Sequence, residues 1–265
     1  MAADCPEGSR HTQSKNPSRM AAGCPEGSRH AQSKRVIPSM CSRYSLTSPH
    51  EAVRAYFSYS GGHEFPPRPN IAPTQPVAIV RNSLAATREL TLVRWGLLPP
   101  WVKDPREFAT LINARCETVT EKPSFRGAIR HKRCLVPSDG FYEWTGVKGA
   151  KRPFLVRPKS GGVFAMAGLF EQWLGADGSE METMAILTCA ANEFMTPLHD
   201  RMPVILAKSD FDLWLDCRPG SARGVLDLLR PAAEDLLEMI EMQPNLNDPR
   251  PKTELNEDSN LRKLI

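Results

Sequence analysis

The sequence predicts an α+β fold, a single domain with a curved, mixed or antiparallel β-sheet core flanked by helices. Two observations support this class. Strand-like apolar runs fill the middle of the chain, and helical patterns lie toward its ends. The two kinds of element do not alternate regularly, which disfavours a doubly wound parallel sheet. At 265 residues, the chain is long enough to bury a core of ordinary size.

The first predicted element is a helix that starts near Ser48. Ser48 can cap this helix, Pro49 suits its first position, and apolar residues follow at helical spacing. Apolar runs bounded by turn residues then predict a series of strands. These strands cover residues 77–81, 90–97, 134–144, 154–157, 163–173, 183–191 and 202–207. The turn residues of 175–178 predict a hairpin loop between two of them.

Helical patterns occur at four further places. They cover residues 117–131, 210–217, 221–229 and 232–242. In the last of these, Leu236, Leu237 and Ile240 fall on one face of the predicted helix.

The chain is expected to divide into three parts. Residues 1–39 contain a duplicated segment and are nearly free of aliphatic and aromatic side chains. Such a segment cannot offset the entropy of ordering, so we predict that it is disordered, and that it is either removed or a mis-assigned start ahead of Met40. Residues 40–245 form the predicted folded domain, and 246–265 form a polar tail.

The net charge of +4 does not identify a partner. Residues 1–40 hold six basic and three acidic residues, which leaves 28 basic and 27 acidic residues, or +1, for the rest. A mean hydropathy of −0.37, without any run near the ~20 apolar residues that span a bilayer, excludes an integral membrane protein. Bulk composition therefore indicates only a soluble globular chain.

The cysteines argue against stabilising cross-links. There are seven, an odd number, and none forms a Cys-x-x-Cys pair. This disfavours a disulfide framework and a structural zinc site, so no metal and no cofactor are predicted. A reducing cytoplasm is the expected compartment, since the N-terminus lacks the apolar segment of a secretion signal.

Three blocks of polar and aromatic residues could carry chemistry. They are Asn113-Ala114-Arg115, Asp139-Gly140-Phe141-Tyr142-Glu143-Trp144 and His199-Asp200-Arg201-Met202-Pro203. Each residue alone has a structural explanation: Glu143 suits a solvated strand face, His199 a structural role and Asn113 a turn. The chain has no glycine-rich phosphate loop, Gly-x-Ser-x-Gly elbow or His-Glu-x-x-His motif, which disfavours the common nucleotide, serine-hydrolase and zinc-protease classes.

Together with Met40-Cys41-Ser42-Arg43-Tyr44, these blocks resemble the SRAP family, the SOS response-associated peptidases, which are abasic-site processing proteins. Further blocks occur in the family's order: Asn70-Ile71-Ala72-Pro73-Thr74, Arg94-Trp95-Gly96-Leu97 with Pro100-Trp101, Asn113 to Thr118, and Arg133-Cys134-Leu135-Val136-Pro137. The resemblance implies a barrel-like sheet core. Two departures are Ser42, where the family usually has Gly, and the 39 residues ahead of Met40.

The resemblance also implies a reaction and its residues. Cys41, once it is the first residue, would be an aminothiol that forms a thiazolidine with the aldehyde of an abasic site, a covalent DNA–protein cross-link. Glu143 would act as general base near the Cys41 amine, and His199 would move a proton. Asn113 would position the ring-opened sugar.

The partner implied by the resemblance is single-stranded DNA containing abasic sites, in the DNA damage (SOS) response. Arg43, Arg115 and Arg201 would contact phosphates, because a guanidinium matches phosphate geometry. Pro73, Trp101, Phe141 and Trp144 are the candidates for stacking on bases or wedging between them. The protein is expected to be a monomer in the bacterial cytoplasm, at the nucleoid when bound to DNA.

Two alternatives use the same sequence features. A cysteine-dependent peptidase or self-processing protease could use Cys41 with His199 and Glu143. Release of the residues ahead of Cys41 by such a reaction would itself create the aminothiol. A non-covalent single-strand binding module would need only the arginines and aromatic residues.

Overall fold

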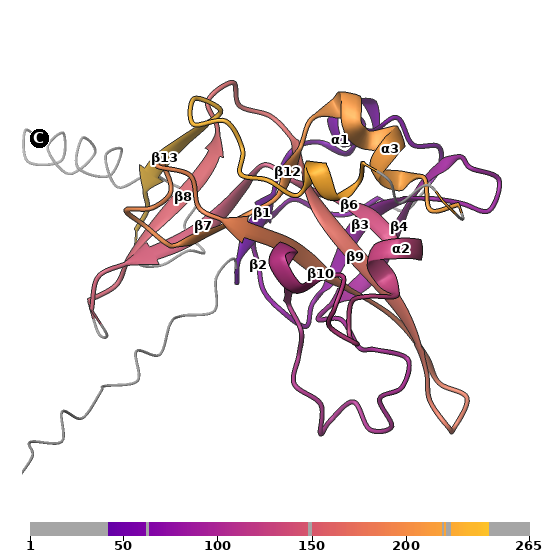
Figure 1. Ribbon diagram of the computed structural model, residues 1–265. Helices are drawn as coiled ribbons and strands as arrows, with labels where there is room; N and C mark the ends of the chain where they lie inside the picture. The colour runs from indigo at the N-terminus through magenta and orange to yellow at the C-terminus, as the bar shows by residue number, and fades with distance from the viewer. Residues whose placement is uncertain (1–41, 62–63, 148–149, 219, 221–223, 244–265) are drawn as a thin grey trace, which may run out of the picture. The chain divides into compact units, whose positions relative to one another are not determined.

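The computed structural model describes residues 42–61, 64–147, 150–218, 220 and 224–243. Two sheets and a few short helices make up this part of the chain (Figure 1). The predictions for residues 1–39, for Cys41 and for the tail at 246–265 lie outside the described residues. No helix among those described is long and apolar enough to cross a membrane.

The first sheet is antiparallel and has the order β13-β8-β7-β1-β2. Its strands are β1 (Tyr44–Leu46), β2 (Arg68–Ile71), β7 (Gly140–Thr145), β8 (Arg152–Pro158) and β13 (Leu237–Glu241). Three of the five, β1, β2 and β13, were not predicted. β1 and β2 have only three and four residues, too few for a recognisable alternation of apolar and polar side chains.

The second sheet is a mixed barrel. Its main path is β11-β10-β4-β3-β6-β9-β12, and β9 also pairs with β10, so that β10, β4, β3, β6 and β9 close into a five-stranded ring. β10 runs parallel to β4 and β5, and the other pairs are antiparallel. The strands are β3 (Pro76–Asn82), β4 (Arg88–Trp95), β5 (Asn113–Arg115), β6 (Arg133–Ser138), β9 (Phe164–Leu174), β10 (Glu180–Ala190), β11 (Arg201–Pro203) and β12 (Ile205–Leu206).

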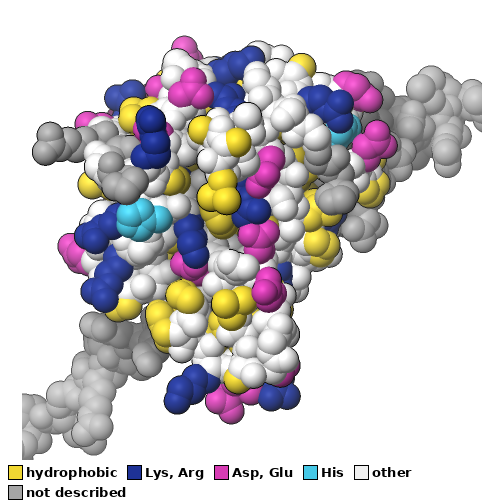
Figure 2. All heavy atoms as spheres, turned by 90° about the vertical axis from the view of Figure 1, so that its right-hand side faces the viewer, with side chains coloured by type: hydrophobic (Ala, Val, Ile, Leu, Met, Phe, Trp, Pro, Cys, Tyr) yellow, Lys and Arg dark blue, Asp and Glu magenta, His cyan; other side chains and the backbone are white. Residues whose placement is uncertain are grey.

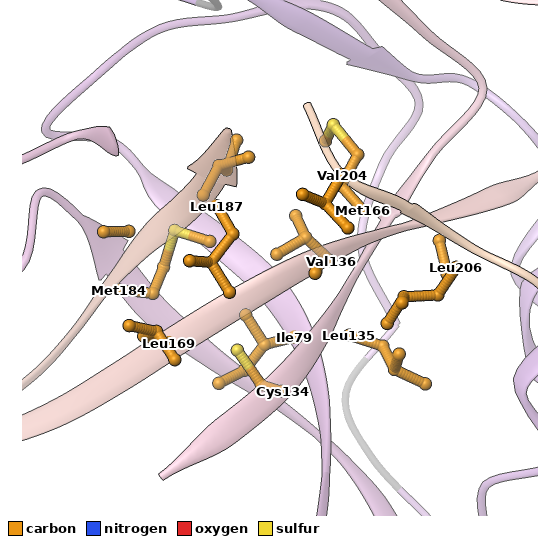
Figure 3. Close-up of a cluster of buried hydrophobic side chains, with 14 of the residues drawn as sticks. Ile79, Cys134, Leu135, Val136, Met166, Leu169, Met184, Leu187, Val204 and Leu206 are labelled. Atoms are coloured by element: carbon orange, nitrogen blue, oxygen red, sulfur yellow. The ribbon is translucent and has the colours of Figure 1, made fainter. Parts of the chain in front are cut away.

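Apolar side chains from the barrel strands fill its interior. Figure 3 shows Ile79, Leu135, Met166 and Leu187, from four different strands, converging on one cluster. All four are at most 1% exposed, as expected where both faces of a strand are covered. The burial of this surface is the main term that stabilises the barrel. The predicted curved, mixed sheet core is therefore confirmed.

Short helices cover the barrel. They are α1 (His50–Phe57), α2 (Ala128–His131) and α3 (Phe211–Leu215), with 3-10 turns η1 (Cys116–Thr118), η2 (Lys208–Asp210) and η3 (Leu226–Leu228). α1 confirms the first predicted helix, although the capping position is Pro49. α3 confirms the core of the prediction at 210–217, and Gly175 to Gly178 form the predicted loop between β9 and β10.

The predicted strand at 134–144 is in fact two strands in different sheets. The break falls at Asp139, whose carboxylate accepts hydrogen bonds from the Ser45 hydroxyl (2.5 Å) and from the backbone and hydroxyl groups of Thr47 and Ser48. These contacts turn the chain from β6 in the barrel to β7 in the first sheet. The sequence shows one apolar run because both strands are buried. The prediction at 202–207 is likewise divided, into β11 and β12.

Two predicted helices are wrong in whole or in large part. Residues 237–241 form strand β13 on the edge of the first sheet, so the helix at 232–242 does not exist. Pairing with β8 overrides the local pattern, a common result for short amphipathic segments. In 117–131 only η1 and α2 are regular, with Pro123 and Gly127 between them. Within the helix predicted at 221–229, the regular element among the described residues is the 3-10 turn η3. Residues 221–223 lie outside the described residues.

The Tyr44 hydroxyl suggests a first test. Tyr44 is 1% exposed, and its hydroxyl has no hydrogen-bond partner among the described residues. Burying a hydroxyl without a partner destabilises the folded state by about 1–3 kcal/mol. We expect Tyr44→Phe to raise the free energy of unfolding by about 1 kcal/mol in chemical denaturation. A decrease of similar size would show that this hydroxyl gains a partner in solution.

Candidate active site and nucleic-acid interface

Trp95, at the end of β4, is the point where the parts of the candidate site meet. Its side chain is fully buried, and its indole N–H donates to the Ile112 carbonyl at 2.9 Å, just ahead of Asn113. The ring packs edge-on against Tyr44 of β1, with centroids 5.3 Å apart. Its backbone carbonyl accepts from the Thr74 N–H at 2.8 Å. One residue thus joins β1, the start of β5 and the turn that carries Pro73.

Asn113 and Arg115 lie on β5, which runs parallel to the second half of β10. The register pairs Asn113 with Ile186 and Arg115 with Thr188. Between them, Ala114 points into the core and is fully buried, so the alternation of a strand turns Asn113 and Arg115 to the other face. Asn113 is half-buried, whereas Arg115 is exposed.

Arg201 takes part in this cluster in a way that the sequence did not predict. Its guanidinium makes a bidentate ion pair with Glu117 at 2.8 and 2.9 Å, and it donates to the Thr188 carbonyl at 2.6 Å. The side chain is only 12% exposed. The phosphate contact of Arg201 stays a prediction that these bonds disfavour, because all three guanidinium nitrogens donate to groups of the protein itself. These contacts hold β11 against η1 and β10.

His199 stands next to this ion pair. The Arg201 backbone N–H donates to His199 Nδ1 at 3.1 Å, and a carboxylate oxygen of Asp200 lies 2.7 Å from the same nitrogen. The neutral ring can accept the first contact with its proton on Nε2, and the protonated ring can donate to Asp200. The side chain is 8% exposed, so the ring is held in place in either protonation state.

Glu143 and Arg43 belong to the first sheet. Glu143 lies on β7 and is 3% exposed, so the carboxylate is not on a solvated strand face. The Tyr142 backbone N–H donates to the Arg43 carbonyl at 3.0 Å and continues the β1–β7 ladder beyond Tyr44. The chain ahead of β1 therefore runs along β7 toward Glu143. The Arg43 guanidinium donates to Asn70 Oδ1 at 2.9 Å.

Pro73 is presented by a rigid turn between β2 and β3. Thr74 adopts φ +71°, a left-handed conformation that is rare for a β-branched residue. Gln75 fixes the turn, because its side-chain oxygen accepts from the Ala72 N–H at 3.0 Å and from the Arg68 guanidinium. The strained backbone and these contacts hold Pro73 in one place, as is typical of a binding site.

Trp101 lies on the long loop between β4 and β5. It is 55% exposed and packs edge-on against Phe108, with ring centroids 5.4 Å apart. A small second core supports the loop: Trp173 of the β9–β10 hairpin donates to the Val102 carbonyl at 2.6 Å. Figure 1 shows this loop beside the hairpin. Phe108 was missed because nothing in its sequence context sets it apart from ordinary packing.

The two aromatic residues predicted on β7 differ. Trp144 is partly exposed and lies near Tyr142, with centroids 6.5 Å apart. Phe141 is 0% exposed and belongs to the core. The DNA contact of Phe141 stays a prediction that its burial disfavours, because alternate residues of a strand face opposite sides and Phe141 faces the interior.

The predicted site residues thus form two groups. Asn113, Arg115, His199 and Arg201 gather around the end of β10, together with Glu117. Arg43, Glu143 and Trp144 follow β1 and β7. Trp95 and Tyr44 join the strands that carry the two groups. Cys41 itself lies outside the described residues.

Three of the described cysteines are poor nucleophiles. Burial raises the pKa of Cys116 to about 12 and that of Cys189 to about 11. Burial also raises the pKa of Cys134 strongly. Because the thiolate is the reactive form, burial makes these three side chains poor candidates for a nucleophile.

A cavity of about 870 Å³ lies away from both groups, between the ends of β3 and β4 and the region of α3, and none of the predicted site residues lines it. Its two inner arginines are engaged. Arg81 pairs with Glu89 and Glu182, and Arg133 donates to the carbonyls that end α2 and α3, such as those of Ile129 and Trp214. The cavity therefore belongs to the packing of these helices.

Comparisons with known proteins agree with the geometry. Residues 40–249 match the family model described as SOS response associated peptidase (SRAP). The abasic site processing protein YoaM of Bacillus subtilis is 38% identical over 215 residues, which cover 80% of this chain and 94% of that protein. YoqW of the same organism, also named an abasic site processing protein, is 37% identical over 215 residues, covering 80% of this chain and 96% of YoqW. A crystal structure of a Bacteroides thetaiotaomicron protein superimposes with a TM-score of 0.67 at 27% identity, covering 79% and 97% of the two chains.

The Glu117–Arg201 pair predicts a pH-dependent stability. The hydrogen bonds from Arg201 lower the pKa of Glu117 below its ordinary value of 4.5. The pair therefore stabilises the protein above about pH 5, and this contribution disappears as the pH falls through the lowered pKa. We expect Glu117→Gln to lower the free energy of unfolding by about 0.5–1 kcal/mol at pH 7, because Glu117 is half exposed, and by much less at pH 3.

Chemical denaturation of both proteins at the two pH values measures this difference. Glu238→Gln, which breaks the exposed pair with Arg157 on the first sheet, serves as the matched control for stability. A Glu117→Gln effect that is equally large at pH 3 would contradict the assigned cause.

Proposed function

The chain belongs to the SOS response associated peptidase (SRAP) family, and on that basis we propose that it processes abasic sites in single-stranded DNA by forming a covalent thiazolidine cross-link through Cys41. The observation that carries this proposal is the family match over residues 40–249, which begins one residue before Cys41. The arrangement of the described side chains supplies further support.

The proposed reaction joins an aminothiol to an aldehyde. The α-amine of Cys41 attacks the C1′ aldehyde of the ring-opened sugar, and loss of one water gives an imine. The Cys41 sulfur then adds to the imine carbon while the nitrogen takes up a proton, which closes the five-membered ring. An unperturbed α-amine has a pKa of about 7.7–8.0, so part of it is neutral and nucleophilic at physiological pH.

Glu143 is proposed as the base that keeps the Cys41 amine neutral. Support comes from its burial on β7 and from the hydrogen bond of the preceding residue, Tyr142, to the Arg43 carbonyl, which continues the pairing of β1 with β7. A buried carboxylate next to the end of β1 can accept a proton from an incoming amine where water is largely excluded.

His199 is proposed to move protons during ring opening and water loss. Its Nδ1 has a partner in each protonation state, Arg201 N–H when neutral and Asp200 when charged, which suits a group that gains and loses a proton in each cycle. Asn113, half-buried on β5 near the same end of β10, is proposed to bind the sugar oxygens.

DNA binding is proposed to use arginines with donors that no described group of the protein occupies, together with exposed aromatic side chains and the Pro73 turn. Arg43 and Arg115 would contact phosphates, because Arg115 is exposed and Arg43 keeps donors beyond its bond to Asn70. Trp101, held against Phe108, and the rigid Pro73 turn would stack on or separate bases, with Trp144 beside Glu143. Stacking does not depend on base identity, so binding would be largely sequence-independent.

A peptidase step fits the same site. In this sequence the nitrogen of Cys41 is bonded to Met40, so the aminothiol exists only after that bond is cleaved. The name of the family favours a self-processing reaction in which the Cys41 thiol attacks the preceding carbonyl and water completes the hydrolysis. This step would precede cross-linking at the same residues.

Cys41 offers the most direct test of the cross-link. Chains that begin at Cys41 should form an adduct with abasic single-stranded DNA that survives a denaturing gel, whereas Cys41→Ala should form none. A chain that retains the residues ahead of Cys41, with Met40→Pro introduced to resist cleavage, should also fail. Cys217→Ala, which removes a different thiol that is itself half-exposed, is the matched control. An adduct that survives in Cys41→Ala would rule out the nucleophile.

The roles of Glu143 and His199 can be separated from binding. We expect Glu143→Gln and His199→Ala to slow adduct formation by about 10²–10⁴-fold, the usual range for a general acid or base, with little change in Kd for intact single-stranded DNA. Single-turnover gels give the rate, and fluorescence anisotropy gives the Kd. Equal losses in both measurements would show that these residues act through the fold.

A further inference from the structure

The segment after Arg115 follows the surface of the barrel as a chain of helical turns. The Lys122 N–H donates to the Thr118 carbonyl at 3.0 Å, and the Arg126 N–H donates to the Lys122 carbonyl at 2.9 Å. The turns continue through Ile129 N–H to the Phe125 carbonyl and end in α2. Although only part of it is regular helix, residues 116–132 therefore place positions four apart about one turn from each other.

One face of this segment is apolar and holds it to the barrel. Val119, Phe125, Ala128 and Ile129 are at most 6% exposed, and α2 packs against β6 and β9. The packing fixes which side of the segment faces solvent. The segment is therefore a surface of defined orientation.

The opposite face carries a row of positive charges. Lys122, Arg126 and Arg130 follow each other at intervals of four residues, and all three are exposed. In the part of the chain that the structure describes, none of the three has an ion pair or a side-chain hydrogen bond. The acidic residues within the segment are Glu117, which pairs with Arg201, and the exposed Glu121.

The row begins at the candidate site. Arg115, the exposed arginine of β5, directly precedes the segment, and the cations then lead away toward α2. α2 lies on the right-hand side of Figure 1, the side that faces the viewer in Figure 2, where Lys and Arg side chains gather on the left part of the surface. Positive charge thus continues from the site over a second stretch of surface.

We infer that Lys122, Arg126 and Arg130 form a backbone track, which binds the sugar–phosphate backbone of the DNA flanking the lesion. This inference rests on the proposed function, because it requires the lesion to be bound at the candidate site, next to Arg115, where the row of cations begins. The track has no exposed aromatic side chain, since Phe125 is buried, so it lacks an aromatic platform for bases. Exposed cations without an aromatic platform recognise mainly the phosphates, which carry no sequence information.

The test compares short with extended DNA. Wild-type protein is titrated with a single-stranded oligonucleotide that spans only the site, and with the same oligonucleotide extended at its 5′ or its 3′ end, as a single strand or as a duplex. Extension on one side should tighten binding at 50 mM salt by about tenfold or more. The triple variant Lys122→Ala, Arg126→Ala, Arg130→Ala should lose this gain, measured relative to its own affinity for the short oligonucleotide.

The salt dependence identifies the contacts. The slope of log K against log salt for extended DNA should fall by about 2 in the triple variant if the flank is single-stranded and by about 3 if it is duplex. The variant Lys122→Arg, Arg126→Lys, Arg130→Lys keeps the charges and should keep the gain. The matched control removes three exposed cations elsewhere, Lys159→Ala, Lys208→Ala, Arg230→Ala, and should also keep it.

The outcomes separate this inference from the proposed function. If the wild-type protein forms no adduct with abasic DNA, the cross-link proposal fails, while binding of intact extended DNA still tests the track. If the adduct forms but the triple variant retains the gain and the slope, the track is refuted. Equal losses in the triple variant and in the control would also refute it, because the effect would then come from net charge alone.

Discussion

The packing of Trp95 between the two sheets is the constraint on which the candidate site depends. Its indole N–H fixes the Ile112 carbonyl, its ring meets Tyr44, and its backbone bonds to the Pro73 turn. β1 belongs to the first sheet and β5 to the barrel. Without Trp95, the connecting loops would contribute more to their relative positions. Because a fully buried indole with a satisfied N–H allows little rearrangement, three segments distant in sequence are held in register with each other.

Around this junction, some polar residues hold the backbone in place, and others are available for the proposed proton transfers. Glu117 and Arg201 use their hydrogen-bonding capacity on each other and on β10, and by doing so they hold the backbone that contacts His199. Glu143 lies on a different sheet, buried beside the strand that follows Cys41 in sequence. A carboxylate base and an imidazole on separate sheets can serve different steps of one reaction, because each protonation state is set by its own neighbours.

The fold explains why so little net charge accompanies a proposed DNA-binding protein. The surplus of +1 over residues 41–265 says nothing about position, yet Arg43, Arg115 and the cations of 122–130 lie outside the ion pairs of the described part of the chain. Many other cations, such as Arg81 and Arg152, are neutralised by carboxylates. A local row of unpaired charges is enough to attract a polyanion, since exposed charges act over about one Debye length.

The class of fold, most barrel strands and the family follow from the sequence alone, because apolar runs and ordered motifs are local properties. The same motifs single out Glu143, His199 and Asn113 as candidate site residues. The sequence did not determine that 232–242 is an edge strand, that Asp139 divides one apolar run between two sheets, or that Phe141 faces the core. Nor could it show that Arg201 is occupied by Glu117, 84 residues away in sequence. Such outcomes depend on pairing and burial between distant segments, and only the tertiary structure decides which partner each side chain meets.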